Sequence, residues 1–255
     1  MEDKVFEISV VMPTYNSERY IIKALNSLIF QENISKQIII VDGGSTDSTL
    51  KIINKFKDYI SHVISEPDSG IPDALNKGFN LAKYEYMIWL NSDDILVRKN
   101  SLADAVKALS ESNQKFGYGH SILVDADDQV INQLYSWQSN GKANRVLSNI
   151  FTGSLIFKRE CWKLFGGFNI SYKLAFEYEL IDFLFDKFGD GFHINKPIGG
   201  FRLHEDGLST RMNQKMQEEI AVLRGIQKKS LLYGRLVQIY GLIRNRKIIN
   251  LIFKK

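Results

Sequence analysis

The chain has one cysteine, Cys161, among its 255 residues. A single thiol excludes an intramolecular disulfide framework and is typical of proteins in a reducing cytosol. No stretch of eighteen apolar residues is present, so no transmembrane helix is expected. The charged opening Met1-Glu2-Asp3-Lys4 and the short apolar run after it predict no secretory signal peptide. We therefore expect a cytoplasmic protein.

Internal repeats and low-complexity segments are also lacking. The first apolar run is followed by Pro13-Thr14-Tyr15-Asn16, where a nucleotidyltransferase would need a glycine-rich loop with lysine or arginine. That absence disfavours a nucleotidyltransferase. The apolar share of 44% and the aromatic share of 12% suffice for a full core. The length predicts one large domain, alone or with an appendage.

Net positive charge is concentrated at the end of the chain, and the rest is mildly acidic. Residues 211–255 hold 11 Lys/Arg and 2 Asp/Glu, a net charge of +9, which leaves −5 for residues 1–210. Apolar residues recur there at helical spacing, among them Met216, Ile220 and Leu223. A basic amphipathic helix can lie on an anionic membrane, or it can pack on the domain with its basic face in water. No aromatic interleaving accompanies the charge, which argues against nucleic acid.

Short apolar runs alternate with helical patterns in the first hundred residues. Expected strands cover residues 8–12, 38–41, 62–65 and 86–90. Expected helices cover residues 17–30, 48–56 and 71–82, the first with Ser17 as its N-cap. This alternation predicts an α/β fold, with a doubly wound, mainly parallel central sheet and helices on both faces. Later elements are helices at 104–112 and 176–188 and strands at 116–124, 129–136 and 154–157.

Two carboxylates follow directly after buried strands. Asp42 ends the run Ile38–Val41, and Asp93 comes shortly after the run Tyr86–Leu90. Ligands bind at the carboxyl edge of such sheets, so both should face one crevice. One carboxylate can accept from a base N–H, and the other can hold a divalent cation against a diphosphate. Alternatively, each carboxylate can simply cap the helix that follows its strand.

Four ordered motifs resemble family 2 inverting glycosyltransferases of the GT-A fold, of the kind that assembles bacterial polysaccharides and glycans. The motifs are VVMPTYN at 10–16, IVDGGSTD at 40–47, EPDSGI at 66–71 with DALNKG at 73–78, and WLNSDD at 89–94. The resemblance implies contacts with the nucleotide-sugar from Pro13, Thr14, Tyr15, Asp42, Asp68, Asn76, Asn91 and Ser92. It makes Asp93 the ligand of a divalent cation, Mn²⁺ or Mg²⁺. Asn91 stands where the family's metal motif usually has its first aspartate.

The catalytic base of this family follows a Gly-Gly-Phe segment and opens a helix. Gly166–Asn169 matches that segment, and the resemblance makes Glu177 the base, with Glu179 as the alternative. Two residues turn a helix by about 200°, so only one of the two can face the site. Arg202 and His204 lie in a segment that resembles the family's flexible loop after the last core strand. Either could reach the leaving diphosphate.

The expected function is metal-dependent, inverting transfer of a hexose or N-acetylhexosamine from a nucleotide-diphospho-sugar, a UDP-sugar, to a hydroxyl. The acceptor would be a glycan or a polyprenyl-diphosphate-linked molecule. Residues 1–210 would form the GT-A domain, with 1–100 binding the nucleotide and 101–210 the acceptor. Residues 211–255 would form a basic amphipathic helical tail that can hold the protein at the inner face of the cell membrane. A non-catalytic GT-A partner subunit stays an alternative, as does, less favoured, a nucleotidyltransferase.

Overall fold

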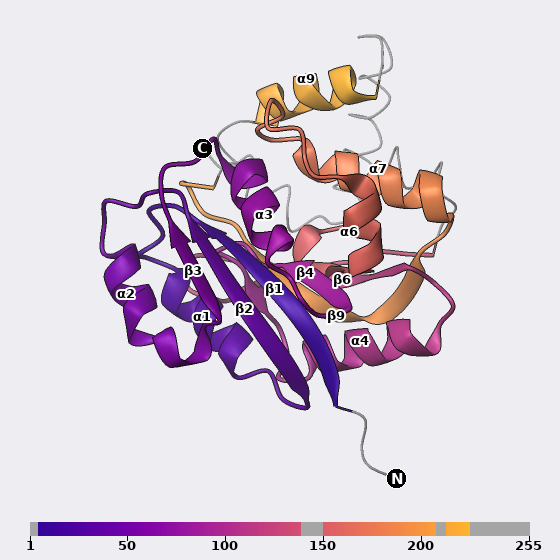
Figure 1. Ribbon diagram of the computed structural model, residues 1–255, viewed down its shortest axis with the longest axis horizontal. Helices are drawn as coiled ribbons and strands as arrows, with labels where there is room; N and C mark the ends of the chain where they lie inside the picture. The colour runs from indigo at the N-terminus through magenta and orange to yellow at the C-terminus, as the bar shows by residue number, and fades with distance from the viewer. Residues whose placement is uncertain (1–4, 139–149, 208–212, 225–255) are drawn as a thin grey trace.

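The computed structural model describes residues 5–138, 150–207 and 213–224. They form one nine-stranded sheet with helices on both faces, in the strand order β3-β2-β1-β4-β8-β6-β9-β5, with β7 paired to β6 (Figure 1). None of the helices in these three ranges is both long and apolar enough to cross a membrane. Most of the expected basic tail lies outside the described residues.

The first half is a regular parallel unit. Strands β1 (Phe6–Thr14), β2 (Ile34–Asp42), β3 (His62–Ser65) and β4 (Tyr86–Trp89) pair in parallel. The connecting helices are α1 (Ile21–Ile29), α2 (Thr49–Lys55), followed by the 3₁₀ turn η1 (Lys57–Tyr59), and α3 (Ile71–Asn80). Because all four strands run the same way, the loops that follow them meet at one edge of the sheet.

The second half is mixed. Strand β8 (Leu155–Lys158) runs antiparallel to both β4 and β6 (Phe116–Val124), while β9 (Phe192–Arg202) is parallel to β6. Two short strands, β5 (Ile95–Leu96) and β7 (Val130–Leu134), are antiparallel to β9 and β6. The helices are α4 (Ser101–Glu111), α6 (Arg159–Phe165), α7 (Phe176–Phe188) and α9 (Asn213–Leu223), with a 3₁₀ turn η2 at Thr152–Ser154.

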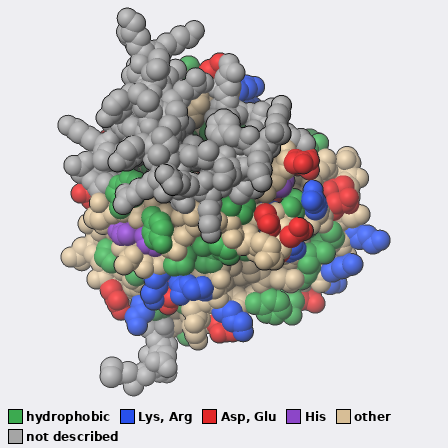
Figure 2. All heavy atoms as spheres, turned by 180° about the vertical axis from the view of Figure 1, so that it is seen from behind, with side chains coloured by type: hydrophobic (Ala, Val, Ile, Leu, Met, Phe, Trp, Pro, Cys, Tyr) green, Lys and Arg blue, Asp and Glu red, His purple; other side chains and the backbone are tan. Residues whose placement is uncertain are grey.

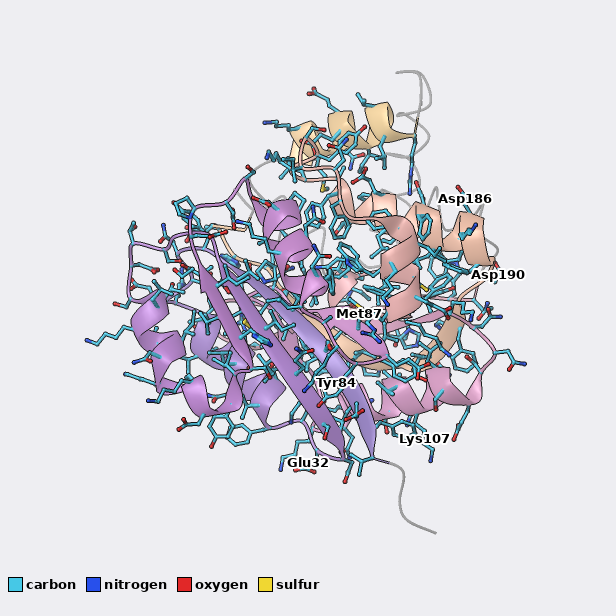
Figure 3. The ribbon with its side chains drawn as sticks, viewed as in Figure 1. Glu32, Tyr84, Met87, Lys107, Asp186 and Asp190 are labelled. Atoms are coloured by element: carbon cyan, nitrogen blue, oxygen red, sulfur yellow. The ribbon has the colours of Figure 1, made fainter. Side chains whose placement is uncertain are left out.

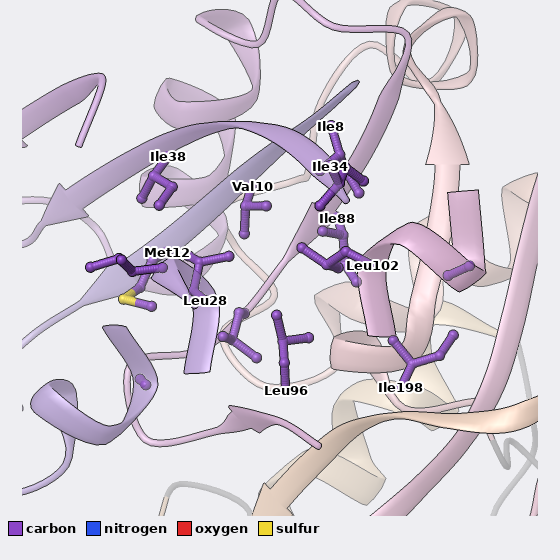
Figure 4. Close-up of a cluster of buried hydrophobic side chains, with 14 of the residues drawn as sticks. Ile8, Val10, Met12, Leu28, Ile34, Ile38, Ile88, Leu96, Leu102 and Ile198 are labelled. Carbon is purple, nitrogen blue, oxygen red and sulfur yellow. The ribbon is translucent and has the colours of Figure 1, made fainter. Parts of the chain in front are cut away.

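Alternation along the central strands divides the core into two layers. Val10 and Met12 face the layer that packs on α1 and α4, shown in Figure 4. Val11 and Val41 face the opposite layer, which packs on α3, α6 and α7. Gly78 of α3 permits this second packing, because a Cβ there would lie 2.3 Å from Val11. Strands buried on both faces explain why the apolar runs of the sequence are continuous rather than alternating.

Most expected elements are confirmed, and some boundaries differ. The strands at 62–65 and 116–124 and the helix at 176–188 have the expected bounds. The expected cap Ser17 is wrong, because α1 begins four residues later with Tyr20 at its N-cap position. The segment with Arg202 is also not wholly a loop, since β9 extends to that residue. Strands β5 and β9 and helix α6 were not expected.

Charged side chains surround this sheet, as Figures 2 and 3 show. On the face seen in Figure 2, acidic and basic side chains of the described residues are interspersed. Glu32 and Lys107 mark the sheet edge near the N-terminus in Figure 3, while Asp186 and Asp190 mark the far end of α7. The candidate site lies at the other edge, where β1, β2 and β4 end.

Candidate functional site

Loops from three neighbouring strands are tied together at the carboxyl edge of the sheet. The last residues of β1 and β2, Thr14 and Asp42, lie side by side in the parallel register. Beyond β1, the hydroxyl of Ser17 lies 2.7 Å from that of Ser92, in the loop after β4. The N–H of Asn16 donates to Ser45 Oγ at 2.8 Å, in the loop after β2. These cross-loop bonds hold a preformed rim of polar groups.

Asp42 is fully buried at the base of this rim. Its Oδ2 accepts from Ser45 N at 3.0 Å, Gly44 N at 3.2 Å and Ser65 Oγ at 2.8 Å, and Ser45 Oγ donates to Oδ1. The carboxylate therefore organises its own loop. A contact between Asp42 and a nucleobase stays a prediction, and it would be added to these bonds.

Other expected nucleotide-binding residues line the same rim. Tyr15 is 62% exposed, whereas Pro13 and Thr14 are buried. Asp68 accepts from Gly70 N at 2.7 Å, and burial raises the pKa of its carboxyl. It lies against Gly43, where a Cβ would come within 2.8 Å of Asp68 Oδ2. A side chain at position 43 would therefore displace Asp68, and this explains why the motif has glycine there.

The loop after β4 carries two carboxylates in different environments. Asp94 is buried and accepts from Asn91 Nδ2 at 2.9 Å and from Arg202 N at 3.0 Å. Burial, reinforced by the charge of Asp93, raises the pKa of Asp94 well above its usual range. The side chain of Asp93 is 34% exposed. Asp94 therefore supports the loop, and Asp93 is available to a ligand.

Asp93 and His204 form a pair at the mouth of this loop. His204 Nε2 lies 2.9 Å from Asp93 Oδ2, and the buried Nδ1 of His204 has no partner among the described residues. Asp93, with His204 beside it, could hold a hard divalent cation, because such cations prefer carboxylate oxygens as ligands. No three His, Cys, Asp or Glu side chains converge within the described residues. A cation held here would therefore take its remaining ligands from phosphate and water.

Arg202 lies beneath the pair with a fully buried side chain. Its Nε donates to the carbonyl of Asp93 at 2.7 Å and its Nη1 to that of Asp125 at 2.9 Å. Its Nη2 lies 2.5 Å from Asp128 Oδ1 as an ion pair, without the orientation of a hydrogen bond. The guanidinium also stacks 4.9 Å from the centre of the Tyr20 ring. Arg202 thus holds the loop of Asp93 from below.

Glu177 lies in the first turn of α7, on the same face as the core residues Leu180 and Ile181. It keeps part of its surface exposed, and no described residue makes a hydrogen bond or ion pair with its carboxyl. Packing by the surrounding atoms raises its pKa to about 7. A carboxyl in this state can take a proton at neutral pH.

The two other polar candidates near α7 have structural partners. Glu179 accepts from Asn169 N at 3.0 Å, and although that bond opposes it, burial raises the pKa of Glu179. Asn76 of α3 uses both ends of its amide on the main chain of Phe168, at 2.8 and 2.9 Å. The expected contact of Asn76 with the nucleotide stays a prediction, and it would compete with these bonds.

A chain of aromatic contacts places α7 relative to the loop of Asp93. Trp89, at the end of β4, has its ring centre 6.1 Å from that of Phe168. Phe168 lies 5.3 Å from Phe176, the residue before Glu177. The Nζ of Lys173 also reaches the carbonyl of Ser69, next to Asp68. The start of α7 is thus fixed to both the β4 end and the loop of Asp68.

A hollow of about 500 Å³ lies at the other edge of the sheet, between the start of β2 and α4. Asp104 on its wall is already paired with Arg98 at 2.8 Å and Lys196 at 3.1 Å. Hydrogen bonds with these cations keep the pKa of Asp104 below its usual range, although burial opposes them. This hollow is lined by none of the rim residues and is separate from the rim.

The sequence profile of the family described as Glycosyl transferase family 2 matches residues 9–164. This range contains the strands and loops of the rim and covers more than half of the chain. The chain belongs to glycosyl transferase family 2. The profile ends before Glu177, Arg202 and His204, so their placement rests on the structure.

Curated relatives and solved structures extend this family-2 match. Hyaluronan synthase of Pasteurella multocida is 26% identical over 246 residues, 95% of this chain and 25% of the relative. Chondroitin synthase of Escherichia coli is 29% identical over 213 residues, 80% and 30% of the two chains. This family-2 chain thus spans a quarter to a third of the length of these relatives.

Among solved structures, S. aureus TarS 1–349 in complex with UDP-GlcNAc superimposes with a TM-score of 0.70 at 21% identity, covering 85% of this chain and 66% of that one. The mannosyltransferase PcManGT from Pyrobaculum calidifontis, in complex with GDP-Man and Mn²⁺, gives 0.64 at 17% identity, covering 89% and 68%. At such identities the likeness shows the fold, and it confirms the expected GT-A architecture of this family-2 chain.

Sequence reasoning missed several features of this site. It did not foresee that Arg202 is buried under Asp93, nor that His204 pairs with Asp93 itself. The bond between Ser17 and Ser92 was also missed. The partners in these contacts are separated by 75 to 111 residues, so no local pattern announces them.

Proposed function

We propose that this chain carries out metal-dependent, inverting transfer of a sugar from a UDP-sugar to a hydroxyl of a glycan or lipid-linked acceptor. Glu177 is the observation that carries this proposal. Its carboxyl is shielded and has no hydrogen-bond or ion-pair partner among the described residues. It has a pKa raised to about 7 and stands on the helix that aromatic contacts attach to the loop of Asp93. A general base acts best when its pKa lies near the working pH.

The rim supports binding of a nucleotide. The loops that hold Asp42, Asp68 and Ser92 meet where open α/β sheets bind ligands, and exposed Tyr15 stands beside them. Tyr15 and Thr14 would flank the base, and Asp42 would accept from its N–H. The solved neighbours TarS and PcManGT are in complex with UDP-GlcNAc and GDP-Man, respectively. The curated relatives named above are synthases of hyaluronan and chondroitin, which favours polysaccharide assembly, while the UDP-GlcNAc complex of TarS favours a UDP-sugar.

Asp93 and His204 would hold the cation. The carboxylate of Asp93 suits a hard cation such as Mn²⁺ or Mg²⁺, and PcManGT provides a precedent for Mn²⁺ on this fold. A bound divalent cation would offset negative charge that develops on a leaving diphosphate. Arg202 holds the loop of Asp93 by donating to the main-chain carbonyl of Asp93. Asn91 donates a hydrogen bond to the carboxyl of Asp94 in the same loop.

Glu177 would remove the proton from the acceptor hydroxyl as its oxygen attacks the anomeric carbon. The new C–O bond forms as the bond to the diphosphate breaks, so a single displacement inverts the anomeric centre. Burial keeps Glu177 neutral below about pH 7, and ionised carboxylate becomes available above it. Glu179, which is bonded to Asn169, stays a positional alternative for the base.

The experiment compares Glu177→Gln with its matched control Glu179→Gln in the full chain. UDP-GlcNAc, UDP-glucose and GDP-Man serve as donors, with and without Mn²⁺, and release of the nucleoside diphosphate is measured. Glu177→Gln should lower turnover by about 10²–10⁴-fold, the usual share of general-base catalysis, and should leave donor affinity nearly unchanged. Glu179→Gln should stay close to wild type.

Three results would change the proposal. Loss of turnover in Glu179→Gln alone would mean that Glu179, and not Glu177, is the base. Donor binding without release by the wild-type chain, for every donor and in the presence of an oligosaccharide acceptor, would favour the non-catalytic partner subunit. Retention of the donor's anomeric configuration in the product, measured by proton NMR, would exclude the single displacement.

A further inference from the structure

Helix α9 packs directly on helix α7, although more than twenty residues separate them in sequence. Ile220 is buried against Ala175 and Tyr178, with Met216 and Leu223 at the margin of the contact. Figure 1 shows α9 lying across the top of the molecule beside α7. The first part of the expected tail is therefore attached to the helix that carries Glu177.

Glu219 holds the two residues that lead into α7. Ala175 is the N-cap residue, and its side chain makes no hydrogen bond to the first turn. Glu219 Oε2 accepts from the N–H of Leu174 at 2.8 Å and from the N–H of Ala175 itself at 3.0 Å, directly before that turn. Both of these residues are buried, so water cannot easily replace the carboxylate. A buried N–H without a partner is strongly unfavourable, which ties the geometry of this turn to Glu219.

Arg224 forms a second anchor one turn further along. Its Nε and Nη2 donate to the two oxygens of Asp182, each at 2.9 Å, and its guanidinium lies 4.9 Å from the ring centre of Tyr178. A bidentate pair of this kind fixes orientation as well as distance. Glu219 and Arg224 thus clamp α9 along the stripe of α7 formed by Ala175, Tyr178 and Asp182.

Glu177 lies two residues after Ala175, about 200° around the helix, so the two side chains leave opposite faces of the same turn. The placement of its carboxyl therefore depends on where α7 begins. Charged groups near this turn are Glu179 and Asp182 on α7 and Glu219 and Arg224 on α9, yet burial alone accounts for the raised pKa of Glu177. Any loosening of the turn that lets water reach this carboxyl would lower that pKa.

We propose that Glu219 of α9 is a positioning residue for catalysis, which fixes the start of α7 and so holds the base Glu177 in place. The inference rests on the proposed function, because it assigns α9 a role toward that base. It implies that residues 213–224 belong functionally with the acceptor half rather than with a detachable tail.

The experiment uses the full chain with Glu219→Ala, Glu219→Gln and Arg224→Lys. Val222→Ala is the control on the same helix, since Val222 is 71% exposed. Two quantities are measured. The first is the pKa of the Glu177 carboxyl, from a ¹³C NMR titration assigned with Glu177→Gln. The second is turnover against pH with UDP-GlcNAc or whichever probe donor the wild type cleaves fastest.

Glu219→Ala should move the pKa of Glu177 from about 7 toward its ordinary value of 4.5. Plateau turnover should fall by about 10²-fold, the loss expected when a catalytic group moves by about 1 Å, and the KM for the donor should change little. Glu219→Gln keeps an oxygen that can accept both N–H groups, so it should restore most of the turnover. Arg224→Lys loses the bidentate geometry and should have an intermediate effect, while Val222→Ala should have none.

The outcomes separate this inference from the function on which it rests. If Glu177→Gln loses turnover while Glu219→Ala keeps the wild-type pKa, pH profile and plateau, α9 has no positioning role and the base assignment stands. If turnover of Glu219→Ala falls with an unchanged Glu177 pKa and pH profile, Glu219 stabilises the fold only, and the inference is overturned. If Glu177→Gln turns over like wild type, the proposed base is wrong, and the inference is withdrawn with it.

Discussion

Arg202 Nε donates to the main-chain carbonyl of Asp93 over 2.7 Å, from a side chain that is fully buried. The same guanidinium contacts the Asp125 carbonyl and Asp128, so one cation joins the end of β9 to two loops. The sequence suggested that Arg202 or His204 could reach the diphosphate. In the structure the Arg202 side chain is fully buried and bonded to the main chain of Asp93, so it supports the loop of the proposed metal ligand.

Arg202→Lys should therefore damage both stability and metal binding. A lysine keeps the charge but cannot serve three separate acceptors in a fixed plane. The free energy of unfolding should fall by about 1–3 kcal/mol, because the charge is kept while buried acceptors lose their hydrogen bonds. Arg98→Lys is the matched control, because Arg98 is 37% exposed and should change stability by about 1 kcal/mol or less. Urea unfolding checks both, and equal losses in the two variants would contradict this reading.

Asp93→Asn should abolish Mn²⁺-dependent binding of UDP while leaving the chain folded. The amide keeps the size of the carboxylate but lacks the charge that a hard cation needs. His204→Gln should weaken the same binding, because Nε2 is the second donor of the pair. Isothermal titration of UDP with and without Mn²⁺ measures the effect, and Asp58→Asn, at an exposed carboxyl, is the control. Mn²⁺-dependent affinity that survives in Asp93→Asn would remove Asp93 from the metal site.

The pKa of Glu177 predicts opposite pH dependences for activity and stability. A base with a pKa of about 7 is active when ionised, so kcat should rise with pH and level off above about 7. The stability of the fold changes in the opposite direction. The pKa of Glu177 in the folded state lies above the ordinary 4.5, so ionisation is disfavoured only when the chain is folded. The contribution of Glu177 to the free energy of unfolding is therefore complete below about pH 4.5 and is lost as pH rises through 7.

Glu177→Gln should consequently be more stable than wild type at pH 8, by about 2–3 kcal/mol, and equal to it at pH 4. Loss of activity together with a gain of stability is the signature of a strained functional residue. Chemical unfolding at the two pH values checks this. A stability difference that does not depend on pH would mean that the Glu177 carboxyl is not shielded from water.

The parallel half of the fold could be predicted because its signals are local. The apolar run Ile38–Val41 and the turn residues after it identify a buried strand and its loop without any tertiary information. Strand β9 was not foreseen, because its sequence FHINKPIGGFR contains a proline and two adjacent glycines that suggest a loop. Gly199 is required there by packing, since a Cβ would lie 2.4 Å from the carbonyl of Gly153.

The residues of the candidate site could be predicted from the sequence, but the contacts between them could not. The sequence distinguished Asp93 from Asp94 only through the family resemblance, whereas the structure separates them by burial and by the bond from Asn91. The carboxylate that completes the start of α7, Glu219, lies 44 residues after Ala175. A contact of that separation is set by the packing of α9 on α7, and no periodic pattern in the chain encodes it.

Asn91→Asp tests why this chain departs from the usual metal motif. Asn91 Nδ2 donates to buried Asp94 at 2.9 Å, so an aspartate would replace a donor with a second negative charge. The variant should lose about 1–3 kcal/mol of stability, the penalty for leaving Asp94 without this partner. Thermal unfolding at pH 8 measures the loss, and Asp94→Asn in the same background should relieve it. An Asn91→Asp protein as stable as wild type would show that the bond is dispensable.

Two nested truncations separate a membrane role of the basic tail from the role of α9. Removing the residues from about Ser230 should leave turnover unchanged, because Glu219 and Arg224 are kept. The same truncation should reduce sedimentation with anionic vesicles at low salt, since each basic residue near such a surface contributes about 1 kcal/mol and salt screens it. Removing the residues from Asn213 should, in addition, lower turnover, because the start of α7 would lose its contacts with α9.

Equal sedimentation of full-length and Ser230-truncated chains would mean that the tail serves another partner. Full turnover in the chain that lacks α9 would show that α7 holds its first turn unaided.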